Sequence, residues 1–200
     1  IFMVIQIIGG NFIQSNTIGS VMLNHFHVPE FVTGMVLVIL IFTVSAGGLK
    51  RLTHITQNLV PAMALLYVVS GLLIILFNIT HLPAVLREIV TSAIGWRPLL
   101  GGATGSMIVA MQKGIARGLY SNEAGEGSAP VIHSAANVAH PVEQGITGVT
   151  EVFLDTFVIC TISGLVLGVT DVLDSGLPGS ILMIHAFSTV WGPLKYLVIV

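Results

Sequence analysis

The chain has 200 residues, of which 54% are hydrophobic and only 8% are charged. An ordinary soluble domain carries roughly a quarter charged residues, so a soluble fold of this size would lack the polar surface that water requires. With 7 basic and 9 acidic residues, the net charge is −2, which excludes the basic surface that nucleic-acid binding needs. We therefore expect lipid to surround most of the chain.

Two apolar runs stand out as membrane-spanning helices. Residues 31–49 and 57–78 contain no acidic or basic side chain, and each is close to the roughly 20 residues that cross a bilayer core. Further spans are predicted at 1–24 and 143–169, at 101–139 with a break at 119–129, and from about residue 194 onward. The sequence thus predicts one incomplete transmembrane domain over 1–200, a piece of a longer multi-pass protein.

Two shorter segments do not have the pattern of a span. Residues 82–95 place apolar side chains at helical spacing with Arg87 and Glu88 on the other side, which predicts a helix lying at the membrane interface. Residues 178–190 are too short to span, and they predict a second surface helix or hairpin. Lys50 and Arg51, in a short predicted loop, favour the cytoplasmic side for that loop and the outside for residues 79–100.

The run SNEAGEGSAP, residues 121–130, combines glycine, serine, asparagine and proline, a composition that breaks a helix. At membrane depth, the backbone groups freed by such a break must bind protein, ions or water in a cavity. Breaks of this kind are typical of transport sites, where helix ends meet charged ligands. The alternative interpretation is an ordinary solvent loop between two short helices.

Several motifs resemble one transporter family. GIARGLYSNEAGEGSAP, HPVEQG and VFLDTFVICT are similar to the signature region of the alanine or glycine:cation symporter family, and GGNFIQSN, GGLKRL, LVPAMALLY and AFSTVWG match it in the same order. The resemblance implies an all-α membrane protein with the leucine-transporter-like five-plus-five inverted-repeat fold, of which the chain would hold core helices three to seven and the start of eight. It also implies symport of small neutral amino acids such as alanine and glycine with Na⁺, or less often H⁺, by alternating access in the cell membrane.

The resemblance further implies a set of site residues. Substrate contacts are expected from the entry helix and from the break: Gly9, Gln14, Tyr120, Ser121, Asn122 and Gly125. An interhelical hydrogen bond is the alternative role for Gln14. Sodium ligands are expected at Ser121 and Asp155. If the coupling ion is a proton, Glu123 or Asp155 is the better candidate carboxylate.

The histidines and glycines have simpler interpretations. His133 and His140 are predicted to be solvated loop residues rather than metal ligands. The pairs Gly114 with Gly118, and Gly164 with Gly168, have the spacing of small residues at close helix contacts.

Two other classes of protein are alternatives to a transporter. An intramembrane hydrolase using Ser128 with His133 or His140 lacks the G-x-S-x-G nucleophile turn, so no enzyme is expected. An ion channel lined by the break would repeat its filter, and no second copy of SNEAG is present in the sequence. The chain also lacks a GK[ST] phosphate-binding loop, so it predicts no nucleotide partner.

Overall fold

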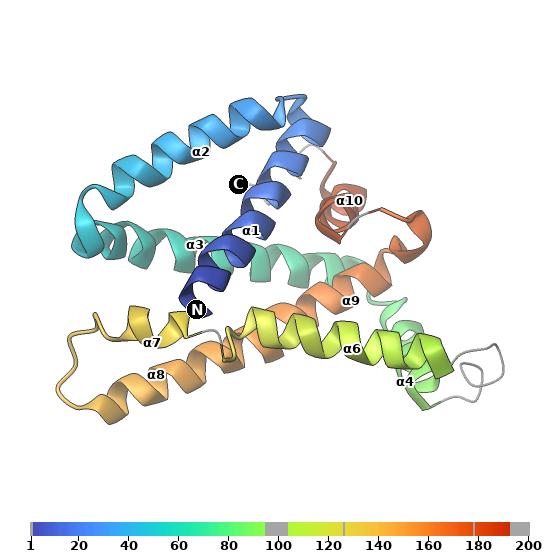
Figure 1. The fold of residues 1–200 in the computed structure, drawn as a ribbon. Helices are drawn as coiled ribbons and strands as arrows, with labels where there is room; N and C mark the ends of the chain where they lie inside the picture. The colour runs from blue at the N-terminus through green and yellow to red at the C-terminus, as the bar shows by residue number, and fades with distance from the viewer. Residues whose placement is uncertain (1, 95–103, 126, 178, 193–200) are drawn as a thin grey trace.

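The computed structural model describes residues 2–94, 104–125, 127–177 and 179–192, and all regular structure in these ranges is helical (Figure 1). The first half contains α1 (Phe2–Phe26), α2 (Glu30–Ser45), α3 (Gly48–Phe77) and α4 (Leu82–Ile94). The second half contains α6 (Thr104–Ser121), α7 (Ser128–His133), α8 (Pro141–Phe153), the π-helical segment η1 (Leu154–Cys160), α9 (Thr161–Val169), the short 3₁₀ segment η2 (Leu173–Ser175) and α10 (Gly179–Trp191). The described part of the chain is all-α, as its composition predicts.

Helix α3 begins earlier than the apolar run alone predicts. Gly48 has a φ of 72°, a left-handed conformation that suits glycine and turns the chain from α2 into α3. Lys50 and Arg51 therefore lie within a helix, and the predicted loop is wrong here because residues 50–56 contain no glycine or proline to stop the helix. Pro61 lies inside α3, where its missing N–H removes one backbone hydrogen bond.

Two helices in the described ranges are long and apolar enough to cross a membrane, Arg51–Phe77 and Pro141–Val169. Only 17% of the most apolar window of each is buried within the chain, whereas the core helix of a soluble protein is mostly buried. Helix α2 is shorter but also apolar, and the Phe42 side chain on it is 73% exposed. These surfaces need lipid or further protein to cover them.

The helix break lies between α6 and α7. The Ala124 N–H donates to the Leu119 carbonyl at 2.9 Å and the Glu123 N–H to the Tyr120 carbonyl at 3.2 Å, with Glu123 itself at a φ of 49°. This is the Schellman pattern, which satisfies the last carbonyls of a helix. Gly125 and Gly127 then take φ values of 82° and 80°. Helical structure stops at Ser121 and resumes at Ser128, inside the predicted break at 119–129.

The helix that follows the break is shorter than predicted. The family resemblance implies helix to residue 139, but α7 ends at His133 and an irregular segment, 134–140, leads into α8. A residue before proline disfavours helical geometry, and His140, before Pro141, has an extended backbone. The Val142 N–H donates to His140 Nδ1 at 3.2 Å, so this histidine caps the start of α8.

Helices α8 and α9 form one continuous rod, because η1 joins them without a break. In Figure 1 the rod rises from the gold α8, below and to the left of α6, to the orange α9, above α6. A π-helix bonds each carbonyl to the N–H five residues ahead and is rare, and it occurs frequently at functional sites. The wider turns of η1 lie where the rod passes the end of α6, since η1 contacts both α6 and the two flanking helices.

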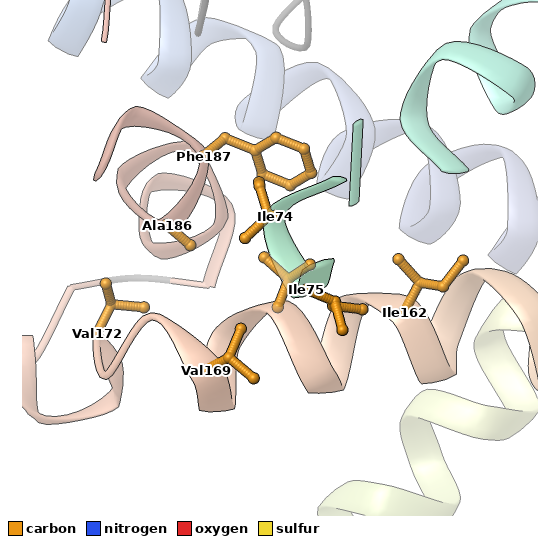
Figure 2. Close-up of a cluster of buried hydrophobic side chains, with 8 residues drawn as sticks. Ile74, Ile75, Ile162, Val169, Val172, Ala186 and Phe187 are labelled. Atoms are coloured by element: carbon orange, nitrogen blue, oxygen red, sulfur yellow. The ribbon is translucent and has the colours of Figure 1, made fainter. Parts of the chain in front are cut away.

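The buried core forms where α3, α9 and α10 meet. Ile74, Val166 and Phe187 are fully buried there, and Figure 2 shows Ile74 and Ile75 of α3 between α10 and α9. A Cβ on Gly71 would lie 2.4 Å from Ile162 Cγ2, so α3 and α9 approach closely at this glycine. Gly168 is equally close to α4, since its Cβ would lie 2.5 Å from Val85 Cγ1. The predicted packing role is confirmed at Gly168 but is wrong for Gly114, Gly118 and Gly164, where an added Cβ would meet nothing within 4 Å among the described residues.

The interfacial helices predicted at 82–95 and 178–190 are helical as α4 and α10, and both pack against α9. Their place at a membrane interface stays a prediction. The span expected from about residue 194 lies outside the described residues.

Candidate functional site

A cleft of about 920 Å³ opens beside the helix break. Helix α3 lines one side with uncharged residues, and the break, α7, α8 and η1 line the other. Three carboxylate side chains reach it, those of Glu123, Glu151 and Asp155, and the described lining residues include no Lys or Arg. A cleft with this charge attracts cations.

Two neighbouring residues at the end of α6 bind two neighbouring residues of η1. The Ser121 hydroxyl donates to Asp155 Oδ2 at 2.5 Å, and the Thr156 hydroxyl donates to Asn122 Oδ1 at 3.1 Å. Adjacent residues of an α-helix diverge by about 100°, which makes paired contacts of this kind difficult. A π-helix has more residues per turn and a smaller angle between neighbours, so η1 presents Asp155 and Thr156 to the break together.

Asn122 is held at both ends of its amide group. Its Nδ2 donates to the Gly118 carbonyl at 3.0 Å while its Oδ1 accepts from Thr156. These two bonds fix the side chain against the end of α6 and across to η1. Asn122 thus links the end of α6 to η1 through hydrogen bonds, a role that its residue type alone did not predict.

The structure places His133 differently from the prediction. Its Nε2 lies 3.1 Å from Glu151 Oε2, and Gln144 Nε2 contacts Nδ1 on the other side of the ring. The side chain is 23% exposed, so the prediction of a solvated histidine is wrong for His133, because its ring lies against Gln144 and Glu151 of α8. His140 is exposed, as predicted.

A signal for this cluster was present in the sequence. Gln144, Glu151 and Asp155 recur at seven- and four-residue intervals, which places them on one face of an otherwise apolar helix. A polar stripe of this kind needs partners when the rest of the helix faces lipid or protein. The stripe does not reveal the identity of the partners, because they lie on segments distant in the sequence.

The predicted substrate residues are brought together only in part. Ser121 and Asn122 line the cleft, whereas Gln14, Tyr120 and Gly125 are not among its described lining residues. Gln14 is exposed on α1, and Gly9 lies in the same helix. Tyr120 is half-buried on the last turn of α6, and Gly125 is exposed within the break. The predicted sodium ligands, Ser121 and Asp155, are in direct contact.

The full length of the chain, residues 1–200, matches the Sodium:alanine symporter family. The chain belongs to this family. It is a family of transporters, and the related proteins named below are symporters and carriers rather than enzymes. The hydrolase alternative is therefore excluded.

Three relatives show the extent of the similarity. The amino-acid carrier protein AlsT of Bacillus subtilis is 40% identical over 166 residues, which cover 83% of this chain and 35% of that protein. The sodium/alanine symporter AgcS of Methanococcus maripaludis is 39% identical over 158 residues, 79% of this chain and 34% of AgcS. The probable sodium/glutamine symporter GlnT of Bacillus subtilis is 38% identical over 170 residues, 84% of this chain and 35% of GlnT. The family member described here thus spans about a third of the length of these relatives.

Proposed function

We propose that the full-length protein is a secondary active transporter that carries small neutral amino acids, alanine and glycine, together with sodium across the cell membrane. The observation that carries this proposal is that Ser121 and Asn122, at the end of α6, form hydrogen bonds with η1 beside a cleft lined by carboxylates. Family membership supports it, as do the names of the related sodium/alanine and amino-acid carriers.

The sodium site in this proposal uses the Ser121 hydroxyl and the Asp155 carboxylate. Hard cations take oxygen ligands, and a carboxylate supplies the balancing charge. The C-terminal end of α6 adds the partial negative charge of the helix dipole on the same side. When sodium binds, the Ser121 proton turns away from Asp155 and both oxygens face the ion.

The substrate site in this proposal lies on the two sides of the break and on α1. Tyr120, Ser121, Asn122 and Gly125 are the proposed substrate contacts at the break, and Gly9 and Gln14 are the proposed contacts from α1. The proposed architecture is the leucine-transporter-like inverted repeat, with this chain as core helices three to seven and the start of eight. Alternating access in this multi-pass protein then moves the segments around the break while the ligands stay bound.

Reciprocal binding tests the proposal. Sodium and a small amino acid that share one site must tighten each other's binding by the same factor. The measurement is alanine affinity of the full-length protein at several sodium concentrations, followed by sodium affinity at several alanine concentrations. Lithium and potassium serve as ion controls, and glycine and glutamine test substrate size, because GlnT is named as a glutamine symporter.

The outcomes separate the candidates. Mutual tightening by sodium supports the proposal. Alanine affinity that follows pH and ignores sodium supports a proton-coupled symporter instead. Alanine affinity that follows neither cation contradicts symport by this protein. Rapid sodium flux without alanine dependence indicates an ion channel.

A further inference from the structure

A second polar group lies at the cleft, apart from the contact between Ser121 and Asp155. His133 ends α7, and Gln144 and Glu151 lie on the facing side of α8. The imidazole packs against Gly148, since a Cβ there would lie 3.9 Å from His133 Cε1. The ring therefore joins α7 to α8 through polar contacts on both of its nitrogens.

The chemistry of the three side chains suits the binding and release of a proton. A neutral imidazole accepts at one nitrogen and donates at the other, whereas an imidazolium donates at both. Glu151 accepts a hydrogen bond from Nε2 in either state. The Gln144 amide donates its N–H to a neutral Nδ1, and after half a rotation it offers its carbonyl oxygen to a protonated Nδ1. The ring thus keeps both hydrogen bonds in both protonation states.

The charged side chains among the described residues around the ring are acidic. Glu151 faces it from α8, and Glu123 of the break and Asp155 of η1 line the same cleft. The α3 residues on the cleft are apolar or uncharged: Val60, Pro61, Ala64, Leu65 and Val68. Histidine is the side chain whose ordinary titration falls near physiological pH.

We propose that His133, Gln144 and Glu151 form a proton-binding site, and that a proton on His133 strengthens the attachment of α7 to α8. The carboxylate of Glu151 accepts a charge-assisted hydrogen bond in both states, and a proton on His133 adds the attraction of an ion pair to it. Because α7 follows the break directly, the proton state of His133 sets how readily the break rearranges. The effect of this proton on transport rests on the proposed symport, whereas proton binding to His133 does not depend on that proposal.

Direct titration of the full-length protein tests the proton site. Histidine labelled with ¹⁵N gives one NMR resonance that His133→Gln removes, and the chemical shift of this resonance is followed from about pH 5 to pH 8. Gln144→Glu replaces an amide that donates or accepts by a carboxylate that only accepts. We expect this variant to raise the midpoint of the resonance by about one pH unit or more, because a nearby opposite charge favours the protonated ring.

Transport provides the second measurement. At saturating sodium, alanine uptake should depend on pH. Gln144→Glu should move the midpoint of this pH profile to higher pH by the same interval as the NMR midpoint. His133→Gln should flatten the profile while uptake still depends on sodium. The matched control is His140→Asn, which keeps a good helix cap outside the cleft and should leave the profile unchanged.

Three results would overturn the proton site: a His133 resonance that does not titrate, a midpoint that Gln144→Glu leaves in place, or an unchanged pH profile in a His133→Gln protein that still transports. Absence of sodium-dependent alanine uptake in the unmodified protein contradicts the proposed symport instead, and the NMR titration then decides the proton site alone.

Discussion

At the scale of single residues, the end of α6 is defined by pairs of side chains that are distant in the sequence. Ser121 contacts Asp155 and Asn122 contacts Thr156, so the break is tied to η1 by two hydrogen bonds. The backbone adds left-handed residues, one of which is Glu123 rather than glycine. Non-glycine residues in this conformation cost of order 1 kcal/mol and gather at functional sites, where the surrounding structure holds them.

The first prediction concerns the proposed sodium ligands. Asp155→Asn keeps the shape of the side chain but removes its charge, so the sodium concentration for half-maximal alanine uptake should rise at least about tenfold, the equivalent of roughly 1.4 kcal/mol. Ser121→Ala should raise it less. The double variant should fall short of the sum of the two effects, because both residues act on one ion.

The control for this prediction is Asp171→Asn. Asp171 is an exposed carboxylate outside the cleft with a φ of 54°, a conformation that asparagine also adopts. The Asp171→Asn variant should leave the sodium concentration for half-maximal alanine uptake unchanged. Strict additivity of Ser121→Ala and Asp155→Asn would argue that the two side chains do not share an ion.

The second prediction concerns Gly125. Its φ is 82°, and a Cβ added to it would meet no neighbouring group within 4 Å among the described residues, so this glycine is needed for its backbone and not for space. Gly125→Ala should therefore destabilise the protein by about 1 kcal/mol, and because Gly125 is a proposed substrate contact it should reduce alanine uptake more than glycine uptake. Thermal unfolding in detergent and parallel uptake assays measure the two effects.

Gly114→Ala is the matched control, because Gly114 lies inside α6 and an added Cβ would meet nothing within 4 Å in the described ranges. It should be neutral or stabilising by up to about 1 kcal/mol. Equal loss of alanine and glycine uptake in Gly125→Ala would argue that Gly125 does not contact the substrate methyl group.

At the scale of elements, α3 supports the rod that carries η1. Ser163 of α9 contacts the Ile159 carbonyl at 2.7 Å, and its hydroxyl shares a hydrogen bond of 2.6 Å with the hydroxyl of Tyr67 on α3. The Tyr67 ring also packs on Phe187 of α10, with ring centres 5.6 Å apart. These contacts hold the junction of η1 and α9, and so they help to orient Asp155 at the other end of η1.

The third prediction tests the crossing of α3 and α9. Gly71→Ala would place a methyl group 2.4 Å from Ile162 Cγ2, and overpacking of this kind typically costs about 1–3 kcal/mol. The midpoint of thermal unfolding should fall. Adding Ile162→Ala removes the colliding methyl group, so the double variant should lose less stability than the two single variants added together.

Gly164→Ala, on α9, is the control for this crossing because an added Cβ meets nothing within 4 Å in the described part of the chain. It should not lower the unfolding midpoint. Equal destabilisation by Gly71→Ala and Gly164→Ala would indicate that the contact with Ile162 is not the reason for a glycine at position 71.

At the scale of the whole molecule, two apolar helices of spanning length and several shorter ones expose large apolar side chains. The described core is confined to the meeting point of α3, α9 and α10. Most of the remaining apolar surface therefore depends on lipid or on further protein for cover. The direction in which these helices cross the membrane follows from charge and is open to measurement.

The fourth prediction is the orientation. Lys50 and Arg51 favour the cytoplasmic side for the start of α3, and residue 81 at the other end of the helix should then lie outside. In a cysteine-free full-length protein, Arg51→Cys should react with a membrane-impermeant thiol reagent only from the cytoplasm, and His81→Cys only from outside. The reverse pattern would invert the topology.

Much of the fold was predictable from local chemistry. Apolar runs, glycine and proline act over a few residues, so the helices at 2–26, 30–45 and 82–94 and the break before Ser128 follow from short stretches of sequence. The family was also recognisable, because its motifs are contiguous. The bounds of α3 and α7 were predicted wrongly although local signals were present, because residues 50–56 contain no helix breaker and Pro141 disfavours helix at residue 140.

The sequence by itself determined that this is an apolar helical chain with one polar break. Composition indicates that lipid surrounds much of the chain, and residue order indicates where helices form and stop. Only the tertiary structure decided which side chains the break meets. Asp155 and Thr156 reach it through the π-helical turns of η1, and His133 reaches Glu151 because α7 folds back onto α8. Contacts between segments so far apart depend on the packing of whole helices, which no short stretch of sequence encodes.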